Sequence, residues 1–392
     1  MVKKKTTLPA ETQNNNFISY FKKMDKILLF VTIILVIIGT LSIVSASSRE
    51  TVSRYDYSIY HFFNKHLKVL GLSFTASIAI LCIPTRYYKI LAPVGFLGIG
   101  CLIFSLFLID NIKRGSGAWL ESGGQPSEIA KPLIIMMLAL VFDYYSKKIK
   151  KKQDFNWWIY FGLFVVIGLL FPVLTLVQGD MGTAILTVGI SGIMLLASPV
   201  SKDVKKNCII GCFVLALIGC GSLYMVRGKI FTAEQVERLT KFINPCSKYE
   251  DSGYQICNGF IAMNDGGLTG LGIGKSRQKY SYIPDPHTDS IFAVIIEEVG
   301  LLTGLAILAL YLLMICRILN VSMRTKNIRN RYIAFGVAVY LFLHIVFNLS
   351  GLLAILPLTG VPLPLITYGG SFTLSFLCSL AVIQRICIES KV

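Results

Sequence analysis

The chain has 392 residues, of which 54% are hydrophobic and only 15% are charged, and its mean hydropathy is +0.66. A soluble globular domain cannot keep so much apolar surface away from water, which excludes the soluble enzyme classes. The formal net charge of +17 would suit a nucleic-acid-binding protein, but the positions of the basic residues along the chain argue against that class.

Ten apolar runs follow one another along the chain, and each is long enough to cross about 30 Å of hydrocarbon as an α-helix. We place them at residues 27–46, 67–84, 89–109, 128–145, 157–176, 183–199, 207–226, 290–316, 333–356 and 369–387. The sequence therefore predicts an all-α polytopic membrane protein with about ten transmembrane helices.

The segment before the first run, residues 1–26, is predicted to be a cytoplasmic N-terminus. Phe17, Tyr20, Phe21 and Met24 recur there at helical spacing, which fits either a short helix lying on the membrane interface or an early start of the first span. The first apolar run is too long for the core of a signal peptide and is followed by further spans. We therefore expect it to remain as a membrane anchor.

Basic residues gather in the segments before the first span and after the fourth, sixth and eighth spans. They are Lys3, Lys4, Lys5, Lys22, Lys23, Lys26, Lys147, Lys148, Lys150, Lys151, Lys152, Lys202, Lys205, Lys206, Arg317, Arg324, Lys326, Arg329 and Arg331. Because ten spans place all these segments on one side, the positive-inside rule makes that side cytoplasmic. Both termini, including the tail 388–392, are then cytoplasmic, and residues 227–289 form a large extracellular loop between the seventh and eighth spans.

Eight of the ten cysteines fall in or beside apolar runs, where a thiol usually acts as a small buried hydrophobic group. They do not indicate a metal site. Cys246 and Cys257 both fall in the loop placed outside, where a disulfide can persist. Two separate free thiols are the alternative.

Three extracellular segments hold most of the unusual polar residues: 113–131, 227–289 and 348–371. A loop of about 60 residues usually serves function or partner binding. Shorter polar sites occur where the fifth and sixth spans meet and inside the eighth span. They contain Gln178, Asp180 and Thr183 in the first case, and Glu297 with Glu298 in the second.

Carboxylates at membrane depth are costly, so they must face a protein interior or a water-filled cavity. Those at or near the outer side are Glu128, Asp180, Asp289, Glu297 and Glu298, and the cations on the same side are Lys113, Arg114, Lys131, Arg227, Arg238, Lys275, Arg277 and Lys279. This mixture suits a phosphate or pyrophosphate ligand, with carboxylates left for a metal or for proton transfer. Ion pairs that merely hold loops in place are the alternative for each single residue.

The glycine run GGLTGLGIG, residues 266–274, resembles a nucleotide-binding loop only superficially, because no predicted strand precedes it. Tight turns and close backbone packing explain it better. Pro357, Pro362 and Pro364 interrupt a helix near the outer surface. Such an interruption is tolerated where the backbone lines a cavity or packs inside protein.

Six motifs occur in order along the chain: QPSEIAK at 125–131, QGDMGTA at 178–184, GYQ at 253–255, KSRQK at 275–279, PDPHTDSIFAVIIEEVG at 284–300 and LPLTGVPLPLITYGG at 356–370. Together they resemble the SEDS family (shape, elongation, division and sporulation), whose members polymerise peptidoglycan from lipid II. The segments SAS at 45–47, HFFNKH at 61–66 and GIGKSRQKYSYIP at 272–284 are more similar to the division branch, FtsW, than to the elongation branch, RodA.

The chain departs from the family pattern at several positions. Ala118 precedes Trp119 where a basic residue is usual, and the gap from Trp119 to Gln125 is shortened, which weakens the transfer of a site role to Trp119. Asp285 replaces a usual glutamate and Ser290 a usual aromatic residue. Thr367 replaces a common serine.

The resemblance implies a glycosyltransferase in which a sugar hydroxyl of lipid II attacks the anomeric carbon of the growing glycan and displaces undecaprenyl pyrophosphate. It implies Asp289 as catalytic base or as ligand of a divalent cation (Mg or Mn), with Glu128 assisting and with no organic cofactor. The residues expected to bind substrate are Trp119, Gln125, Lys131, Asp180, Arg238, Arg277, Lys279, His287 and Thr288.

Two other functions fit the same features: a flippase that moves lipid II across the membrane, and a scaffold that only recruits a transpeptidase. The enzyme is favoured because acids and bases concentrate on the outer side, whereas the cytoplasmic loops read as short and merely basic. The resemblance also implies partners, namely a class B penicillin-binding protein and other membrane proteins of the division or elongation machinery. An elongation polymerase of the RodA type is the alternative within the family.

Overall fold

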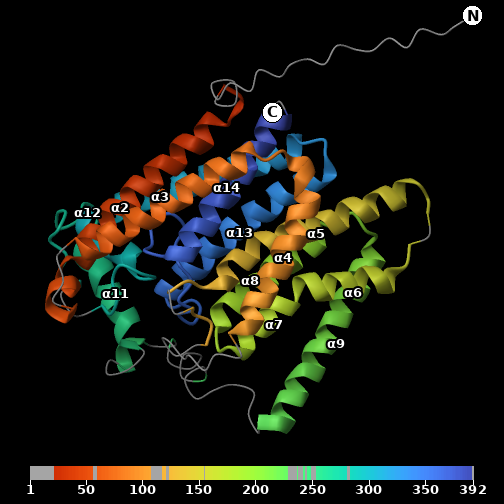
Figure 1. The fold of residues 1–392 in the computed structure, drawn as a ribbon. Coiled ribbons are helices and arrows are strands. Elements are labelled where there is room, and N and C mark those ends of the chain that lie inside the picture. Colours follow the sequence, from red (N-terminus) through yellow and green to blue (C-terminus); the bar gives the residue numbers. More distant parts are fainter. Residues whose placement is uncertain are drawn as a thin grey trace, which may run out of the picture.

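The computed structural model describes residues 22–55, 60–106, 117–120, 123–153, 155–227, 236, 242, 245–248, 253–279 and 283–390. Within them the chain forms α-helices and short 3-10 turns and no strand (Figure 1). The elements are α2 (Lys26–Tyr55), α3 (His61–Cys82), η1 (Thr85–Tyr87), α4 (Tyr88–Ser105), α5 (Pro126–Lys150), α6 (Trp157–Gly168), α7 (Leu170–Val177), α8 (Met181–Ala197), α9 (Lys202–Arg227), η2 (Pro245–Lys248), α11 (Gly253–Gly266), α12 (Ile291–Arg324), α13 (Ile328–Leu352) and α14 (Gly370–Ser390).

Eight helical segments of the described chain are long and apolar enough to cross a membrane, which confirms the predicted fold class. Two of them combine short elements, η1 with α4 and α6 with α7. The sixth predicted run is the shorter apolar helix α8. The seventh is α9, which begins with a turn of charged side chains and is not among the eight. Most of the N-terminal segment expected to lie on the interface falls outside the described residues.

The segments predicted to be cytoplasmic meet at one end of the bundle, which we call the basic end. It holds the residues before α2, the turn before η1, and the ends of α12 and α14. Asp25 at the start of α2 exchanges two hydrogen bonds with Gln384 near the end of α14, at 2.9 and 3.0 Å. Arg385 donates to the carbonyl oxygen of Leu81 at 2.9 Å. The other end carries the segments 117–120, 123–124, 253–279, 283–290 and 353–369, and we call it the loop end.

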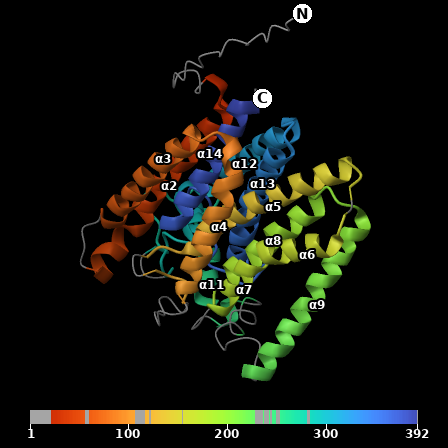
Figure 2. The same ribbon diagram turned by 45° about the vertical axis from the view of Figure 1, so that its right-hand side comes forward.

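The centre of the bundle is formed by α5, α13 and α14, whose side chains are mostly buried. α3 packs along α14, and α12 packs against α2, α11 and α13. α9 stands away from the rest in both views (Figures 1 and 2). It contacts α6, where the ring of Phe161 lies against Gly211.

The glycine run packs against a break inside α12. At Gly300 the backbone has φ of 83°, so the helix is interrupted there. The freed carbonyl oxygens of Glu297 and Glu298 accept hydrogen bonds from the backbone N–H groups of Leu271 and Gly272, at 2.9 and 2.8 Å. A Cβ atom on Gly270 would come within 2.4 Å of the carbonyl oxygen of Glu298. Close backbone packing therefore explains the glycines, as the sequence indicates.

A disulfide joins Cys246 in η2 to Cys257 in α11. It joins the 3-10 turn η2 to the helix that packs against α12. The structure thus contains the bridge that the sequence allowed, and the alternative of two free thiols is wrong.

Candidate functional site

Asp289 lies at the loop end, two residues before α12 begins, and its side chain is half-buried. The Thr288 hydroxyl and the Gln255 amide donate to its carboxylate Oδ1, at 3.0 and 3.3 Å. Gln255 also donates to the hydroxyl of Ser290 at 2.9 Å, which fixes the amide between α11 and α12. No cation pairs with Asp289 among the described residues.

The surroundings of Asp289 raise the pKa of its carboxyl group above the ordinary value of 3.8. Burial is the main cause, because a charged carboxylate loses hydration there. Hydrogen bonds from Thr288, Gln255 and nearby backbone groups lower the pKa and offset part of this effect. A carboxylate with a raised pKa and only neutral donors is a candidate for proton transfer.

The backbone of Asp289 is held by α13. The side-chain amide of Asn348 donates to the carbonyl oxygens of both Asp289 and Val361, each at 2.9 Å. Asn348 therefore joins the start of α12 to the segment 353–369 that folds over the loop end. One turn earlier on the same face of α13, His344 lies against the carbonyl oxygen of Pro362 at 3.2 Å.

Glu128, Lys131 and His344 form a second, fully buried group between α5 and α13. The Lys131 ammonium donates to Glu128 Oε1 at 2.7 Å and lies 3.3 Å from His344 Nε2. The position of Lys131 makes Nε2 the acceptor, so Nδ1 carries the proton and donates to Pro362. The other carboxylate oxygen of Glu128 and the hydroxyl of Tyr340 are buried without a hydrogen-bond partner among the described residues.

Gln125 and Asp180 close the same end of the bundle. The Gln125 side-chain amide donates to Asp180 Oδ2, and Asp180 Oδ1 caps α8 by accepting from the Thr183 N–H at 3.0 Å. The Gln125 backbone N–H donates to the Ser371 hydroxyl at the start of α14, at 3.0 Å. α5, α8 and α14 thus meet at one point next to Glu128.

The two groups are linked through one face of α13 and the segment 353–369. His344 and Asn348, four residues apart, hold Pro362 and Val361, while their other partners are Lys131 and the Asp289 backbone. The structure therefore places the two predicted catalytic carboxylates, Asp289 and Glu128, at the same end of the bundle, joined through α13. Asp289 is the more accessible of the two.

Lys279, which the sequence predicts as a substrate-binding residue, pairs with a glutamate in the structure. It is buried, and its ammonium contacts Glu298 at 2.8 Å, the Ser45 hydroxyl at 3.1 Å and the Gly274 carbonyl oxygen at 2.9 Å. These contacts join the glycine run to α2 and α12. Glu297 is likewise held by the Ser276 hydroxyl and by the backbone N–H groups of Arg277 and Gln278.

The remaining predicted site residues lie at the loop end or outside the described chain. His287 is buried against the rings of Phe62 and Tyr368, with ring centroids 4.4 and 5.4 Å apart. Arg277 is exposed, and Trp119 is half-buried in the loop that hydrogen-bonds to Gln178. Arg238, Lys113 and Arg114 lie outside the described residues.

Several residues of this site were not singled out from the sequence. Gln255 stands in the GYQ motif, but its contact with Asp289 depends on how α11 packs against α12. His344 and Asn348 are polar residues in an apolar run, which is a signal for a functional or structural role. That signal identifies the residues but not their partners in the segment 353–369, which lie 13 and 18 positions further along the chain.

No group of three or more metal-binding side chains occurs within the described residues. A magnesium site does not require such a group, because Mg²⁺ commonly binds one or two carboxylates together with substrate phosphates and water. The carboxylate of Asp289, with the Thr288 hydroxyl 3.0 Å from it, offers the oxygen donors that a hard cation accepts.

Known proteins resemble the chain along nearly its whole length. A family model described as cell cycle protein, covering FtsW, RodA and SpoVE, matches residues 25–392. A probable peptidoglycan glycosyltransferase FtsW from Coxiella burnetii is 31% identical over 377 residues, which cover 94% of this chain and 97% of that protein. The protein of the same name from Bacillus subtilis is 31% identical over 381 residues, with coverage of 94% and 92%.

A solved structure supports the fold independently. It is the structure of a chain from a peptidoglycan synthase complex, described as coordinating polymerization and crosslinking. The two chains superpose with a TM-score of 0.71 at 21% identity, over 94% of this chain and 98% of that one. At this identity the likeness concerns the fold.

Proposed function

The chain belongs to the FtsW/RodA/SpoVE family of cell cycle proteins, and from this membership we propose that its reaction takes place at the loop end, around Asp289. It is a peptidoglycan glycosyltransferase of the division type that acts on lipid II. One observation supports placing the reaction there. Asp289 is a half-buried carboxylate that accepts hydrogen bonds from neutral donors and pairs with no cation among the described residues.

Asp289 acts as the general base in this proposal. A sugar hydroxyl of one lipid II molecule attacks the anomeric carbon at the end of the growing glycan, and Asp289 accepts the hydroxyl proton. The new glycosidic bond forms while the bond from the anomeric carbon to undecaprenyl pyrophosphate breaks, and the pyrophosphate leaves with the bonding electrons. The raised pKa of Asp289 makes it a stronger base than an ordinary carboxylate.

The leaving pyrophosphate needs positive charge near the same place. Arg277 is exposed at the loop end, and Arg238 falls in the same long loop, so these two remain our proposal for pyrophosphate binding. Asp289 would also hold a divalent cation, which neutralises negative charge on the pyrophosphate when it is bound.

Glu128, Lys131 and His344 are positioning residues in this proposal. Lys131 holds His344, and His344 holds Pro362, next to the Val361 carbonyl that Asn348 ties to the Asp289 backbone. This chain of contacts fixes the segment 353–369 above the site. Gln125 and Asp180 hold the ends of α5, α8 and α14 beside it.

The basic end is more polar than the sequence suggested. Asp25 pairs with Arg317 at 2.6 Å and Arg385 pairs with Glu389 at 3.0 Å. The argument that a flippase is disfavoured because this side carries only basic loops is therefore weakened. Polymerase activity does not depend on that argument, and an assay of lipid II movement across vesicles would test flipping separately.

The chain is a multi-pass membrane protein, and we propose that the loop end faces outside the cytoplasmic membrane, because the basic end carries the positive charges. We also propose a class B penicillin-binding protein as partner, since the solved complex with the same fold coordinates polymerization with crosslinking. Other membrane proteins of the division machinery are further proposed partners.

Purified protein, with and without a class B penicillin-binding protein, should convert lipid II into glycan chains that are resolved on a gel. Long products with the partner present are the expected result. If no preparation that binds lipid II forms glycan chains, the proposal is wrong.

A further inference from the structure

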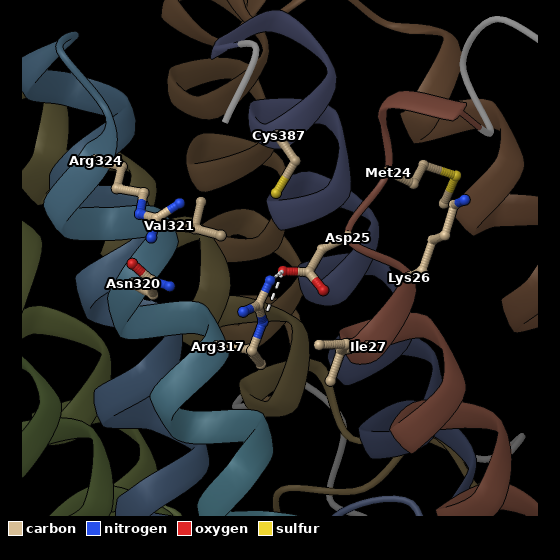
Figure 3. A pocket seen from close by; sticks show the side chains of 9 residues that line it. All are labelled: Met24, Asp25, Lys26, Ile27, Arg317, Asn320, Val321, Arg324 and Cys387. Carbon is tan, nitrogen blue, oxygen red and sulfur yellow. Dashed lines mark hydrogen bonds and ion pairs between the residues drawn. The ribbon is translucent and has the colours of Figure 1, made fainter.

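A cavity of about 270 Å³ opens at the basic end (Figure 3), whereas Asp289 lies at the loop end. Its walls come from three elements: the start of α2, the last two turns of α12 and the end of α14. Arg317, Asn320 and Arg324 lie at positions i, i+3 and i+7 on one face of α12 and line the same cavity. The reaction proposed above makes no use of this cavity.

Asp25 is the one carboxylate among the described residues that line the cavity, and it already has a cationic partner. Asp25 Oδ2 accepts hydrogen bonds from Arg317 Nε and Nη2, at 3.0 and 2.6 Å (Figure 3), and Asp25 Oδ1 accepts from the Leu28 N–H at 2.9 Å. Two hydrogen bonds with Gln384 fix the Asp25 backbone. Arg317 therefore neutralises Asp25, and the pair forms a rigid wall.

Two cations in the cavity wall remain without an acidic partner. Lys26 and Arg324 line the cavity, and neither forms an ion pair with any described residue. After Asp25 and Arg317 cancel, the cavity carries a surplus of about two positive charges. Asn320 adds a neutral amide that can donate a hydrogen bond. This set of donors fits a phosphate group.

The cavity lies at the level where lipid headgroups would meet the protein. The first membrane span begins at Lys26, and the span formed by α12 ends at Arg324. Ile27 and Met323, next to these two cations, are exposed, so acyl chains can lie beside the cavity. Basic pockets between helices on the cytoplasmic side attract anionic lipid headgroups.

We propose that this cavity binds the phosphate group of an anionic phospholipid in the leaflet next to the basic end. Lys26 and Arg324 contact the phosphate, Asn320 donates to it, and the Asp25–Arg317 pair holds α2 and α12 at the required spacing. A lipid bound there joins α2, α12 and α14 across the surface of the bundle.

The test uses the full chain in nanodiscs, extracted and examined by native mass spectrometry for retained lipid. The lipids are phosphatidylglycerol and phosphatidylcholine with identical acyl chains. Arg324→Gln and Lys26→Gln should each reduce retained phosphatidylglycerol by about fivefold, which is the effect of one basic residue near an anionic headgroup. Lys326→Gln is the matched control, because Lys326 is an exposed cation two residues away that does not line the cavity.

A further variant distinguishes lipid binding in the cavity from general attraction to surface charge. Asn320→Phe fills part of the space without changing the charge, so it should also reduce retention of phosphatidylglycerol. Equal retention of the two lipids by the parent protein would overturn the proposal, as would equal losses in Lys326→Gln and Arg324→Gln. Binding of inorganic phosphate in detergent without any retention of phosphatidylglycerol would assign the cavity to a soluble anion and also overturn it.

Discussion

At the scale of single residues, the site depends on two carboxylates in different surroundings. Glu128 is fully buried and has a cation, Lys131, at 2.7 Å, whereas Asp289 is half-buried and has only neutral donors among the described residues. A paired, buried carboxylate suits a positioning role. An accessible carboxylate without a cation suits a role in chemistry.

Lys131→Met should destabilise the protein by about 3 kcal/mol, because it leaves the Glu128 charge buried without its cation. The double variant Glu128→Gln, Lys131→Met should lose less stability than the single one, since both charges are removed together. Denaturant titrations of the detergent-solubilised proteins would measure both effects. A single variant as stable as the parent would contradict the ion pair.

The raised pKa of Asp289 predicts opposite effects of pH on activity and on stability. Activity should fall as the pH drops through the pKa of Asp289, which lies above the ordinary 3.8, because the protonated carboxyl group can no longer accept the hydroxyl proton. At pH values above the ordinary pKa, the carboxylate is harder to ionise in the folded than in the unfolded protein, so its charge lowers the free energy of unfolding. Asp289→Asn should therefore be at least as stable as the parent at pH 7 and lose this advantage near pH 4. Rates that stay constant down to pH 4 would argue against Asp289 as the base.

At the scale of elements, the break in α12 at Gly300 and the glycine run determine the shape of the loop end. The backbone groups freed at the break pair with residues 267–272, and the ion pair between Lys279 and Glu298 closes the same junction. The first half of α12, which follows Asp289, is thereby fixed against α2 and α11.

Two glycines of this run permit a matched comparison. Gly270 and Gly274 have φ of 80° and 81°, but a Cβ atom would meet the Glu298 carbonyl oxygen at 2.4 Å only at Gly270, whereas Gly274 faces open space. Gly274→Ala should cost about 1 kcal/mol from backbone strain alone. Gly270→Ala should cost several times more and should reduce polymerisation. Thermal unfolding of both variants checks this, and equal costs would contradict the packing described above.

At the scale of the whole molecule, the fold followed from hydropathy and charge, because a bilayer requires helices of defined length with basic residues on one side. The helix ends did not: α2 continues to Tyr55 and α12 to Arg324, well beyond the predicted 46 and 316. Hydropathy marks the apolar part of a helix, whereas backbone hydrogen bonding continues into the polar turns.

The site could also be predicted only in part, because local sequence patterns do not show long-range contacts. Motifs predicted Asp289, Glu128, Lys131 and Lys279 as site residues, but they did not predict that each of the two lysines is buried in an ion pair with a glutamate. The break at Gly300 is not visible in an apolar run, and only that break brings the glycine run and Glu298 together. Long-range partners such as Asn348 and Val361 depend on how the segment 353–369 folds back, and no local pattern encodes it.

Topology provides a test of the whole arrangement. Labels placed at residues 150 and 325 should be inaccessible from outside intact cells, and a label near residue 250 should be accessible, because the basic end is expected to face the cytoplasm. Membrane-impermeant thiol or epitope labelling measures this. External labelling at residue 150 would contradict the proposed membrane topology.

The most direct test of the central claim is polymerisation of lipid II by Asp289→Asn, compared with Asp265→Asn. Asp265 is a half-buried carboxylate near the end of α11, in the same half of the fold, and it takes no part in the proposed site. Asp289→Asn should insert, fold and bind lipid II, but its rate of glycan formation should fall by about a hundredfold or more, as expected for loss of a general base. Asp265→Asn should polymerise at the rate of the parent. Glycan formation by folded Asp289→Asn at the parental rate would contradict the assignment of the reaction to Asp289.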